Sequence, residues 1–179
     1  GGIPCNYHGE VVTLKDGNPD SVVPGLMAIG EAACVSVHGA NRLGSNSLLD
    51  LVVFGRAAAN RCAEIMKPGA PHKDLPATAY DAALSNFDRL RHAKGPKPTA
   101  TIRNEMQRCM QLDAAVFRTG ESLGSGMQKM RGIAKSFADV GVSDRSLIWN
   151  SDLVETLELQ NLLGNALTTI VSAENRKES

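Results

Sequence analysis

The sequence lacks several features that would place it quickly in a class of protein. It has 19 Lys and Arg against 19 Asp and Glu, so it has no net charge to attract nucleic acid, which binds basic surfaces. We therefore expect no nucleic acid partner. Its most apolar run, residues 47–59, contains Asp50 and Arg56 and is too short and too charged to cross a bilayer. No signal or transit peptide is recognisable, and we expect a fragment or a processed piece.

Cysteines at metal-binding spacing are also lacking. Cys5, Cys34, Cys62 and Cys109 stand far apart, with no Cys-x-x-Cys pair and no clustered histidines. We expect four reduced thiols in a reducing compartment. The sequence therefore predicts no zinc or iron–sulfur site on this chain, and no metal ligands.

The chain divides into two parts of different pattern. Residues 1–66 are rich in glycine and short apolar runs, residues 67–76 form a proline-rich linker, and residues 77–179 follow the helical period. A chain of this length makes one domain, or one and a half. We expect strands and one helix in the first part, and in the second a helical bundle truncated at its C-terminal end.

In the first part, extended runs lead into one apolar helix. Residues 11–14 predict a strand and residues 17–20 a turn, and residues 24–33 are typical of a buried strand that ends in a Gly-Glu turn. The helix expected over 47–66 is apolar nearly all round. We therefore expect it to be buried on most of its faces.

Four amphipathic helices are predicted in the second part. Methionines recur at helical spacing there, and we interpret them as core residues rather than as ligands. Tyr80, Leu84 and Phe117 fall on the inward stripes. The predicted signals are a Thr78–Asp81 capping box and a Gly95-Pro96 stop for the first helix, Thr101 as the cap of the second, an end near Gly141 for the third, and Asn150 or Ser151 as the cap of the fourth.

Residues 38–50, His-Gly-Ala-Asn-Arg-Leu-Gly-Ser-Asn-Ser-Leu-Leu-Asp, are the most informative stretch for chemistry. Arg42 lies in a loop of small residues that runs directly into the helix expected from Ser47. A guanidinium group binds a carboxylate through two parallel hydrogen bonds, and the unpaired N–H groups of a helix start favour an anion. The loop therefore predicts an anion site, although an ordinary surface arginine is an alternative from these residues alone.

Four blocks of sequence point to a known family. They are Gly1-Gly2-Ile3-Pro4, Gly30-Glu31-Ala32-Ala33-Cys34, residues 38–55, and residues 149–159, which read Trp-Asn-Ser-Asp-Leu-Val-Glu-Thr-Leu-Glu-Leu. Together they resemble the flavoprotein subunit of succinate dehydrogenase (complex II) and of fumarate reductase. The resemblance covers essentially the whole chain. It implies an α/β remnant of a Rossmann-like FAD-binding domain over 1–66, followed by an all-α helical bundle domain over 77–179.

The resemblance also implies roles for individual residues. None of them is implied as a catalytic acid or base. Cys5 stands where the family usually has Thr, and a thiol is the poorer hydrogen-bond donor. The implied roles are a carboxylate clamp for Arg42, contact with the bound dicarboxylate for Ser45, hydrogen bonds to the sugar-like hydroxyls of FAD for Glu31, backbone N–H groups at the flavin pyrimidine edge for Ser47 and Leu48, and support of Arg42 for His38.

In this family a hydride passes from succinate to FAD, and electrons continue to quinone. The resemblance therefore implies a part in the tricarboxylic acid cycle and in electron transport. The implied partners are succinate or fumarate, an iron–sulfur subunit, membrane-anchor subunits and the missing N-terminal half of the flavoprotein. The implied location is peripheral, either on the matrix side of the mitochondrial inner membrane or on the cytoplasmic side of a bacterial cytoplasmic membrane.

Several parts of such a site are not in this chain. It contains no Gly-x-Gly-x-x-Gly fingerprint for the FAD pyrophosphate, no family histidine that attaches FAD, and no capping domain with its proton-accepting arginine. We therefore expect the 179 residues alone to bind FAD weakly or not at all and to be inactive. The alternatives are a fumarate reductase, an L-aspartate oxidase of the same superfamily, and a non-catalytic half of a split flavoprotein that docks partner subunits.

Overall fold

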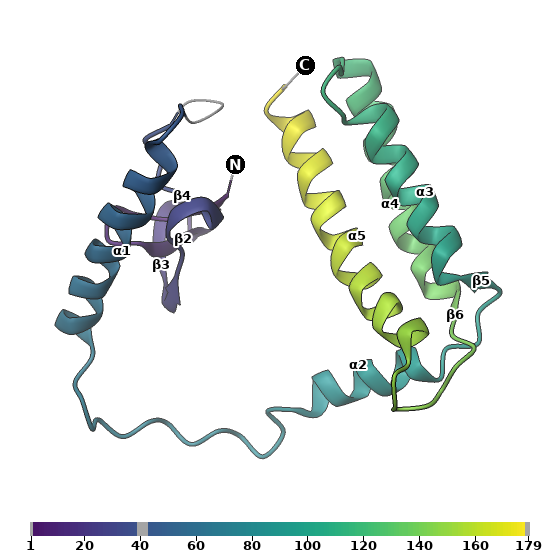
Figure 1. Ribbon diagram of the computed structural model, residues 1–179, viewed down its shortest axis with the longest axis horizontal. Coiled ribbons are helices and arrows are strands. Elements are labelled where there is room, and N and C mark those ends of the chain that lie inside the picture. Colours follow the sequence, from purple (N-terminus) through teal and green to yellow (C-terminus); the bar gives the residue numbers. More distant parts are fainter. Residues whose placement is uncertain (1, 39–42, 178–179) are drawn as a thin grey trace. The chain divides into compact units, whose positions relative to one another are not determined.

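A computed structural model describes residues 2–38 and 43–177 of the chain (Figure 1). The chain divides into two compact units, Gly1–Asp74 and Leu75–Ser179. The boundary falls within the proline-rich segment, where residues 70–76 contain no helix or strand. Among the helices of the described residues, none is both long enough and apolar enough to span a membrane.

The first unit contains two small strand pairs. β2 (Glu10–Lys15) and β3 (Asn18–Met27) form an antiparallel hairpin, and β1 (Ile3–Pro4) pairs in parallel with β4 (Ala33–Cys34). The strand expected at 11–14 is confirmed. The hairpin turn was expected over residues 17–20 and is centred slightly earlier, at residues 16–17. Both of these residues have the positive φ that such a tight turn requires.

The buried strand expected over 24–33 is wrong. β3 ends at Met27 and belongs to a two-stranded hairpin that leaves Leu26 50% exposed. The chain then enters a short 3-10 turn, η1 (Gly30–Ala32). Gly30 has φ +63°, and a Cβ on it would lie 2.2 Å from Cδ2 of Leu51. The apolar residues of this stretch therefore form a turn packed against the following helix rather than an inner strand.

That helix is α1 (Asn46–Ile65), which confirms the helix expected over 47–66. Its expected burial on most faces is wrong. Among its described residues Ala58 is the buried one, whereas Leu48 is 67% and Val52 70% exposed. Within this unit, η1 and a few hairpin side chains provide the cover, and they are too small to enclose a helix of 20 residues.

The described residues of the second unit form four α-helices, which confirms the expected helical domain. α3, α4 and α5 lie side by side as a bundle, and α2 packs against α5 (Figure 1). Two short strands, β5 and β6, pair in parallel beside α3. The elements in chain order are α2 (Asp81–Arg91), β5 (Lys97–Pro98), α3 (Thr99–Asp113), α4 (Gly120–Ser136), the 3-10 turn η2 (Phe137–Asp139), β6 (Val140–Gly141) and α5 (Ser151–Asn175).

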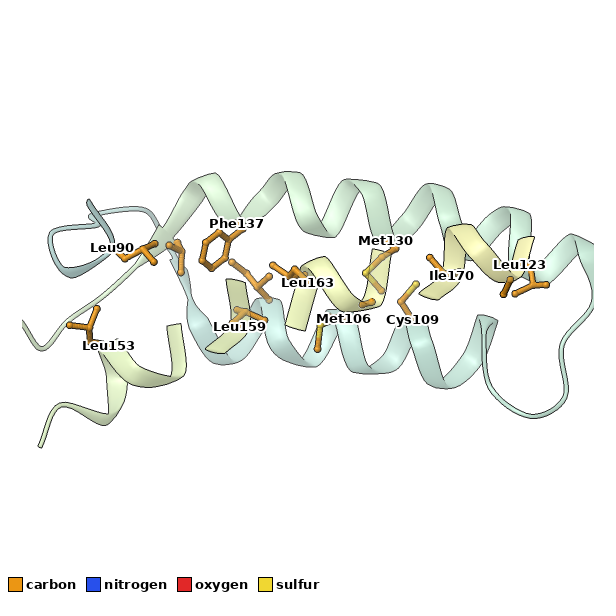
Figure 2. Packing of buried hydrophobic residues seen from close by; sticks show 14 residues of the cluster. Leu90, Met106, Cys109, Leu123, Met130, Phe137, Leu153, Leu159, Leu163 and Ile170 are labelled. Carbon is orange, nitrogen blue, oxygen red and sulfur yellow. The ribbon is translucent and has the colours of Figure 1, made fainter. Parts of the chain in front are cut away.

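One apolar core holds this unit together (Figure 2). It runs along the facing sides of the three long helices, and at one end it takes in Leu90 from α2. Met106 and Met130 are buried in it, as expected of methionines that fill a core. The fully buried side chains are Leu90, Ile102, Leu123, Met130, Val140, Thr156, Leu159 and Ile170.

Of the three helix caps predicted from the sequence, one is confirmed and two are wrong. Asn150 caps α5, since its side chain accepts a hydrogen bond from Leu153 N at 2.9 Å. The Thr78–Asp81 box is wrong, because α2 starts without a side-chain cap. Thr101 is also wrong, because α3 already begins at Thr99, directly after a proline that fixes φ at the helix entry.

Three side chains expected to point inward are exposed. Tyr80 and Leu84 are 64% and 61% exposed, because α2 reaches the core through its C-terminal turn. Phe117 is 95% exposed, because α3 ends four residues before it. In all three cases the helical spacing of apolar residues extends in the sequence beyond the part of the helix that packs against the core.

Two glycines of the second unit lie at a close backbone crossing. Gly95 N donates to Val140 O at 3.0 Å, and a Cβ on Gly95 would lie 1.9 Å from Asp139 O. A Cβ on Gly141 would lie 2.2 Å from Gly95 O. α2 already ends at Arg91, before the stop expected at Gly95-Pro96, and Gly95 instead lets two backbones touch.

Candidate functional site

The start of α1 is built to receive an acceptor from outside the helix. Its N-cap residue, Ser45, has φ +69° and makes no side-chain capping bond, and the first turn contains no acidic residue. Within the described residues, the amides of Asn46 and Leu48 donate at 3.2 Å to the carbonyls of Leu43 and Ser45. A helix of 20 residues concentrates partial positive charge at such an end. The arrangement favours an anion or a polarised oxygen.

Glu31 lies on the turn that packs against this helix. Its neighbour Gly30 contacts Leu51, one turn into α1, so η1 lies close to the beginning of the helix. Glu31 itself is exposed. The structure therefore brings η1 and the early turns of α1, which contain three predicted site residues (Glu31, Ser47 and Leu48), into one neighbourhood.

His38 pairs with a carboxylate inside α1. His38 Nε2 and Asp50 Oδ2 are 2.8 Å apart, and the two side chains are 27% and 9% exposed. A proton on Nε2 donates to Asp50, which leaves Nδ1 of a neutral ring as an acceptor. The pair joins the start of the 38–45 segment to the helix that follows it.

Asp50 is a residue that the sequence interpretation missed as part of the site. Its second oxygen, Oδ1, is buried without a hydrogen-bond partner among the described residues. The signal was present: Asp50 is the one acidic residue in an otherwise apolar stretch at residues 47–55. Buried carboxylates require partners, so a lone one in such a run indicates a structural or functional contact.

Arg42, the predicted carboxylate clamp, lies outside the described residues. The residues on either side of the undescribed segment are His38 and Leu43. His38 is fixed by Asp50, and the Leu43 carbonyl accepts from Asn46. The described residues on both sides of Arg42 are therefore anchored by hydrogen bonds. The role of Arg42 as a carboxylate clamp stays a prediction.

Cys5 lies at the end of the parallel strand pair. Its amide donates to Cys34 O at 3.1 Å, and its side chain is buried. Burial raises the pKa of the Cys5 thiol, and the neighbouring Cys34 and Asp50 raise it further, whereas a hydrogen bond with the Cys34 backbone acts in the opposite direction. The thiol is therefore neutral at ordinary pH.

A charged contact fastens the hairpin to α1. Glu10 accepts hydrogen bonds from Asn6 Nδ2 and from Arg61 Nε, each at 2.8 Å. The hydrogen bond from Asn6, followed by that from Arg61, lowers the pKa of Glu10, and Glu10 in turn raises the pKa of Arg61. This contact holds the strands on the side of α1 where η1 also packs.

Metal ligation finds no support in the described part of the chain, which contains no group of three or more His, Cys, Asp or Glu side chains arranged to hold an ion. The thiols of Cys62 and Cys109 instead contact Met27 Sδ at 3.5 Å and the Gly126 carbonyl at 3.5 Å. The Cys109 thiol is buried and the Cys62 thiol half-buried, and both distances are ordinary contacts of a thiol.

Comparison with known proteins matches two separate parts of the chain to family models. Residues 1–48 match the family model of the FAD binding domain, and residues 103–179 match that of the fumarate reductase flavoprotein C-term. The chain is therefore of the flavoprotein class that combines an FAD-binding part with a helical part.

Individual relatives narrow the class. The chain is 64% identical over its full length to the mitochondrial succinate dehydrogenase [ubiquinone] flavoprotein subunit of Oryza sativa subsp. japonica, and it covers 28% of that protein. It is 59% identical over its full length to the succinate dehydrogenase flavoprotein subunit of Rickettsia bellii, and it covers 30% of that protein. A solved E. coli quinol fumarate reductase chain matches 98% of this chain, with TM-score 0.75 and 33% identity, and is itself covered to 28%.

The chain belongs to the family of succinate dehydrogenase and fumarate reductase flavoprotein subunits, as the resemblance in the sequence implied. It spans between a quarter and a third of the length of the relatives it matches.

Proposed function

We propose that the protein containing this segment oxidises succinate to fumarate, with FAD as the hydride acceptor, and passes the electrons through an iron–sulfur subunit to quinone. The observation that carries the proposal is the start of α1, which has no side-chain cap and has the His38–Asp50 pair beside it. It adjoins the segment that contains Arg42, and the closely similar relatives are succinate dehydrogenase flavoproteins.

The residues of the first unit fit a flavin. The N-terminal end of α1 offers the amide of Ser47 to the pyrimidine edge, together with the amide of Leu48, which also donates to Ser45 O at 3.2 Å. The helix dipole then stabilises negative charge near flavin N1 and O2. Glu31, exposed on η1, accepts hydrogen bonds from the sugar-like hydroxyls of the cofactor. When bound, FAD supplies the two-electron acceptor that this oxidation requires.

Substrate binding is assigned to Arg42 and Ser45. The Arg42 guanidinium binds one carboxylate of succinate through two hydrogen bonds, a geometry that Lys cannot reproduce. Ser45 precedes the helix with a left-handed backbone and contacts the same carboxylate, partly through its main chain. His38, fixed through Nε2 by Asp50, holds the loop in place and supports Arg42.

The remaining expectations follow from the family. We interpret the parallel β1–β4 pair together with α1 as part of a Rossmann-like FAD-binding domain. The partners are the rest of the flavoprotein, an iron–sulfur subunit and membrane-anchor subunits. The complex lies on the matrix side of the mitochondrial inner membrane or the cytoplasmic side of a bacterial membrane, and it serves the tricarboxylic acid cycle.

The test uses the intact flavoprotein subunit with this segment in place. Arg42→Lys should lower kcat/KM for succinate-driven dye reduction by about a hundredfold, since it removes about 3 kcal/mol of charge-assisted hydrogen bonding. Arg56→Lys, which changes an exposed arginine of α1, is the matched control and should leave the rate unchanged. The 179-residue chain alone should show no dye reduction.

Unchanged kcat/KM in the Arg42→Lys subunit, or dye reduction by the chain alone, would contradict the proposal. Turnover of L-aspartate in preference to succinate would favour an L-aspartate oxidase. A flavoprotein that turns over neither substrate would favour the non-catalytic half that docks partner subunits.

Fumarate reduction is a second candidate function. It is favoured by the C-terminal family match over residues 103–179 and by the match to the E. coli quinol fumarate reductase chain. The direction of the physiological reaction is tested by comparing succinate oxidation and fumarate reduction by the intact complex with its native quinone.

A further inference from the structure

The segment between β6 and α5 ends in three consecutive apolar side chains that the chain leaves bare. Leu147 is 64%, Ile148 78% and Trp149 98% exposed. We refer to these three residues as the Trp149 knob. Monomeric proteins rarely expose large apolar side chains in a contiguous group, and such groups mark interaction sites.

The backbone that carries the knob is held firmly. Asn150 Nδ2 donates to the carbonyls of Asp144 at 2.7 Å and Ser146 at 2.9 Å. Asp152 Oδ2 accepts from the amide of Ser143 at 2.7 Å, from its hydroxyl at 2.9 Å, and from the amide of Asp144 at 3.2 Å. A segment fixed by five hydrogen bonds to two side chains presents its tip in a preformed conformation.

The conformation at the tip is costly for the residue that occupies it. Trp149 has φ +52°, a left-handed backbone that is a true outlier for a bulky side chain. Strain of this kind persists where the surrounding structure fixes it, and it clusters at functional contacts. Within the second unit, the effect of the strained turn is to leave an indole ring 98% exposed.

We propose that the Trp149 knob docks into an apolar recess on the part of the flavoprotein subunit that lies outside these 179 residues. The relatives leave room for it, since this chain covers 28% and 30% of their lengths. The recess is apolar because none of the three knob side chains carries a charge. It also offers one acceptor to the indole N–H, which requires a partner when the ring is buried.

The size of the knob favours a contact within one subunit over a second copy of the chain. An aromatic side chain buries at most about 250 Å². Three side chains therefore fall short of the roughly 800 Å² per partner that stable association requires. A contact inside one polypeptide is exempt from this requirement, because the connecting chain already supplies a high effective concentration. The inference concerns assembly of the subunit, and it stands whether or not the proposed reaction is right.

Hydroxyl-radical footprinting with residue-resolved mass spectrometry tests the proposal. Labelling of Leu147, Ile148 and Trp149 is compared between the 179-residue chain and the intact flavoprotein subunit that contains it, without partner subunits. We expect heavy labelling in the chain alone and a several-fold fall in the intact subunit. Trp149→Ser should lower the melting temperature of the intact subunit more than that of the chain alone, where the ring touches solvent.

Phe117 provides the matched control. It is 95% exposed on the connection between α3 and α4, at the other end of the bundle from the Trp149 knob (Figure 1). Phe117→Ser should not reproduce the subunit-specific loss of stability seen with Trp149→Ser.

Each other outcome overturns the proposal. Unchanged knob labelling in the intact subunit leaves the knob undocked, and a fall that requires the iron–sulfur subunit assigns it to that partner. Protection in the chain alone that grows with concentration assigns it to a second copy. If Trp149→Ser and Phe117→Ser lower the melting temperature of the intact subunit equally, the Trp149 knob is ordinary exposed surface.

Discussion

Removing the Asn150 side chain should release the segment that carries the Trp149 knob. The side chain is nearly buried and forms three hydrogen bonds: Oδ1 accepts from Leu153 N at 2.9 Å, and Nδ2 donates to Asp144 O at 2.7 Å and Ser146 O at 2.9 Å. One residue thus caps α5 and ties down the loop before it.

The magnitude follows from these contacts. Loss of the helix cap costs about 1 kcal/mol. Each carbonyl that loses its donor costs up to about 1 kcal/mol, less where water reaches it, and the segment around Asp144 and Ser146 is exposed. Asn150→Ala should therefore lower the free energy of unfolding of the second unit by about 2–3 kcal/mol. Asn150→Ser, which restores the capping oxygen, should recover about 1 kcal/mol of this.

Two measurements separate the global effect from the local one. Denaturant unfolding followed by circular dichroism gives the free energy, and the fluorescence of the single Trp reports on the second unit in which it lies. Trypsin cleavage after Arg145 reports on the loop, since the Arg145 carbonyl is held by Arg91 Nε at 2.7 Å. Asn165→Ala, at an exposed position of the same helix, is the control and should stay within about 0.5 kcal/mol of the parent.

If Asn150→Ala behaves like the control in both assays, the three hydrogen bonds of Asn150 do not stabilise the second unit. A loss of stability without faster cleavage after Arg145 would show that the cap matters and the loop contacts do not. Loss of the whole fold in Asn150→Ala but not in Asn150→Ser would place nearly all of the effect in the cap.

Three further substitutions test other contacts of the second unit. Gly95→Ala would force a Cβ against the Asp139 carbonyl and should cost about 3 kcal/mol in thermal unfolding. Thr156→Val removes the hydroxyl that lies 2.6 Å from the Thr99 hydroxyl, and it should lower the free energy of unfolding by about 2 kcal/mol. Adding Thr99→Val should lower the free energy of unfolding little further. Burial of Asp152 opposes its ionisation, but hydrogen bonds from the preceding loop outweigh this effect and lower its pKa. The contribution of Asp152 to the free energy of unfolding is therefore complete above about pH 4, and it is lost as the pH falls through the pKa of the folded state.

Controls follow from the same structure. Gly132→Ala meets open space in α4 and should stabilise by about 1 kcal/mol, so equal losses at Gly95 and Gly132 would rule out the clash. Additive costs in the Thr99 and Thr156 double-mutant cycle would mean that the two hydroxyls are not coupled. Asp152→Asn should flatten the acid limb of the stability–pH curve, and an unchanged limb would contradict the assignment to Asp152.

The helical unit was predictable because its signals are local. Apolar period and capping chemistry are set within a few residues, so the four helices of this unit were predicted. The ends of two were missed, because α3 stops at Asp113, before Phe117, and α4 stops at Ser136, before the end expected near Gly141. Asn150 was found because an Asn before an apolar run matches the requirement of a helix start. The Thr119–Ser122 capping box of α4 was overlooked, because Ser replaces the Glu or Gln that usually marks the motif.

The strand unit and the site were less predictable because their contacts are distant in sequence. The buried strand expected at 24–33 failed because the apolar pattern does not reveal how many strands cover it, and here β3 has one partner. The His38–Asp50 pair joins residues 12 apart, across a segment for which no periodicity applies. The family resemblance named His38 as a support for Arg42, which stays a prediction, while its partner Asp50 was found only from the coordinates.

The bare apolar surface of α1 has a consequence for how such a chain is made. Leu48, Leu49, Val52 and Val53 are each more than half exposed, and they stand on one continuous helix. On a ribosome or in a dilute cell extract, that surface is a target for holdase chaperones and a seed for aggregation. Yields of the isolated segment should therefore depend on chaperone supply and temperature, and synthesis joined to the remainder of the subunit should relieve that dependence.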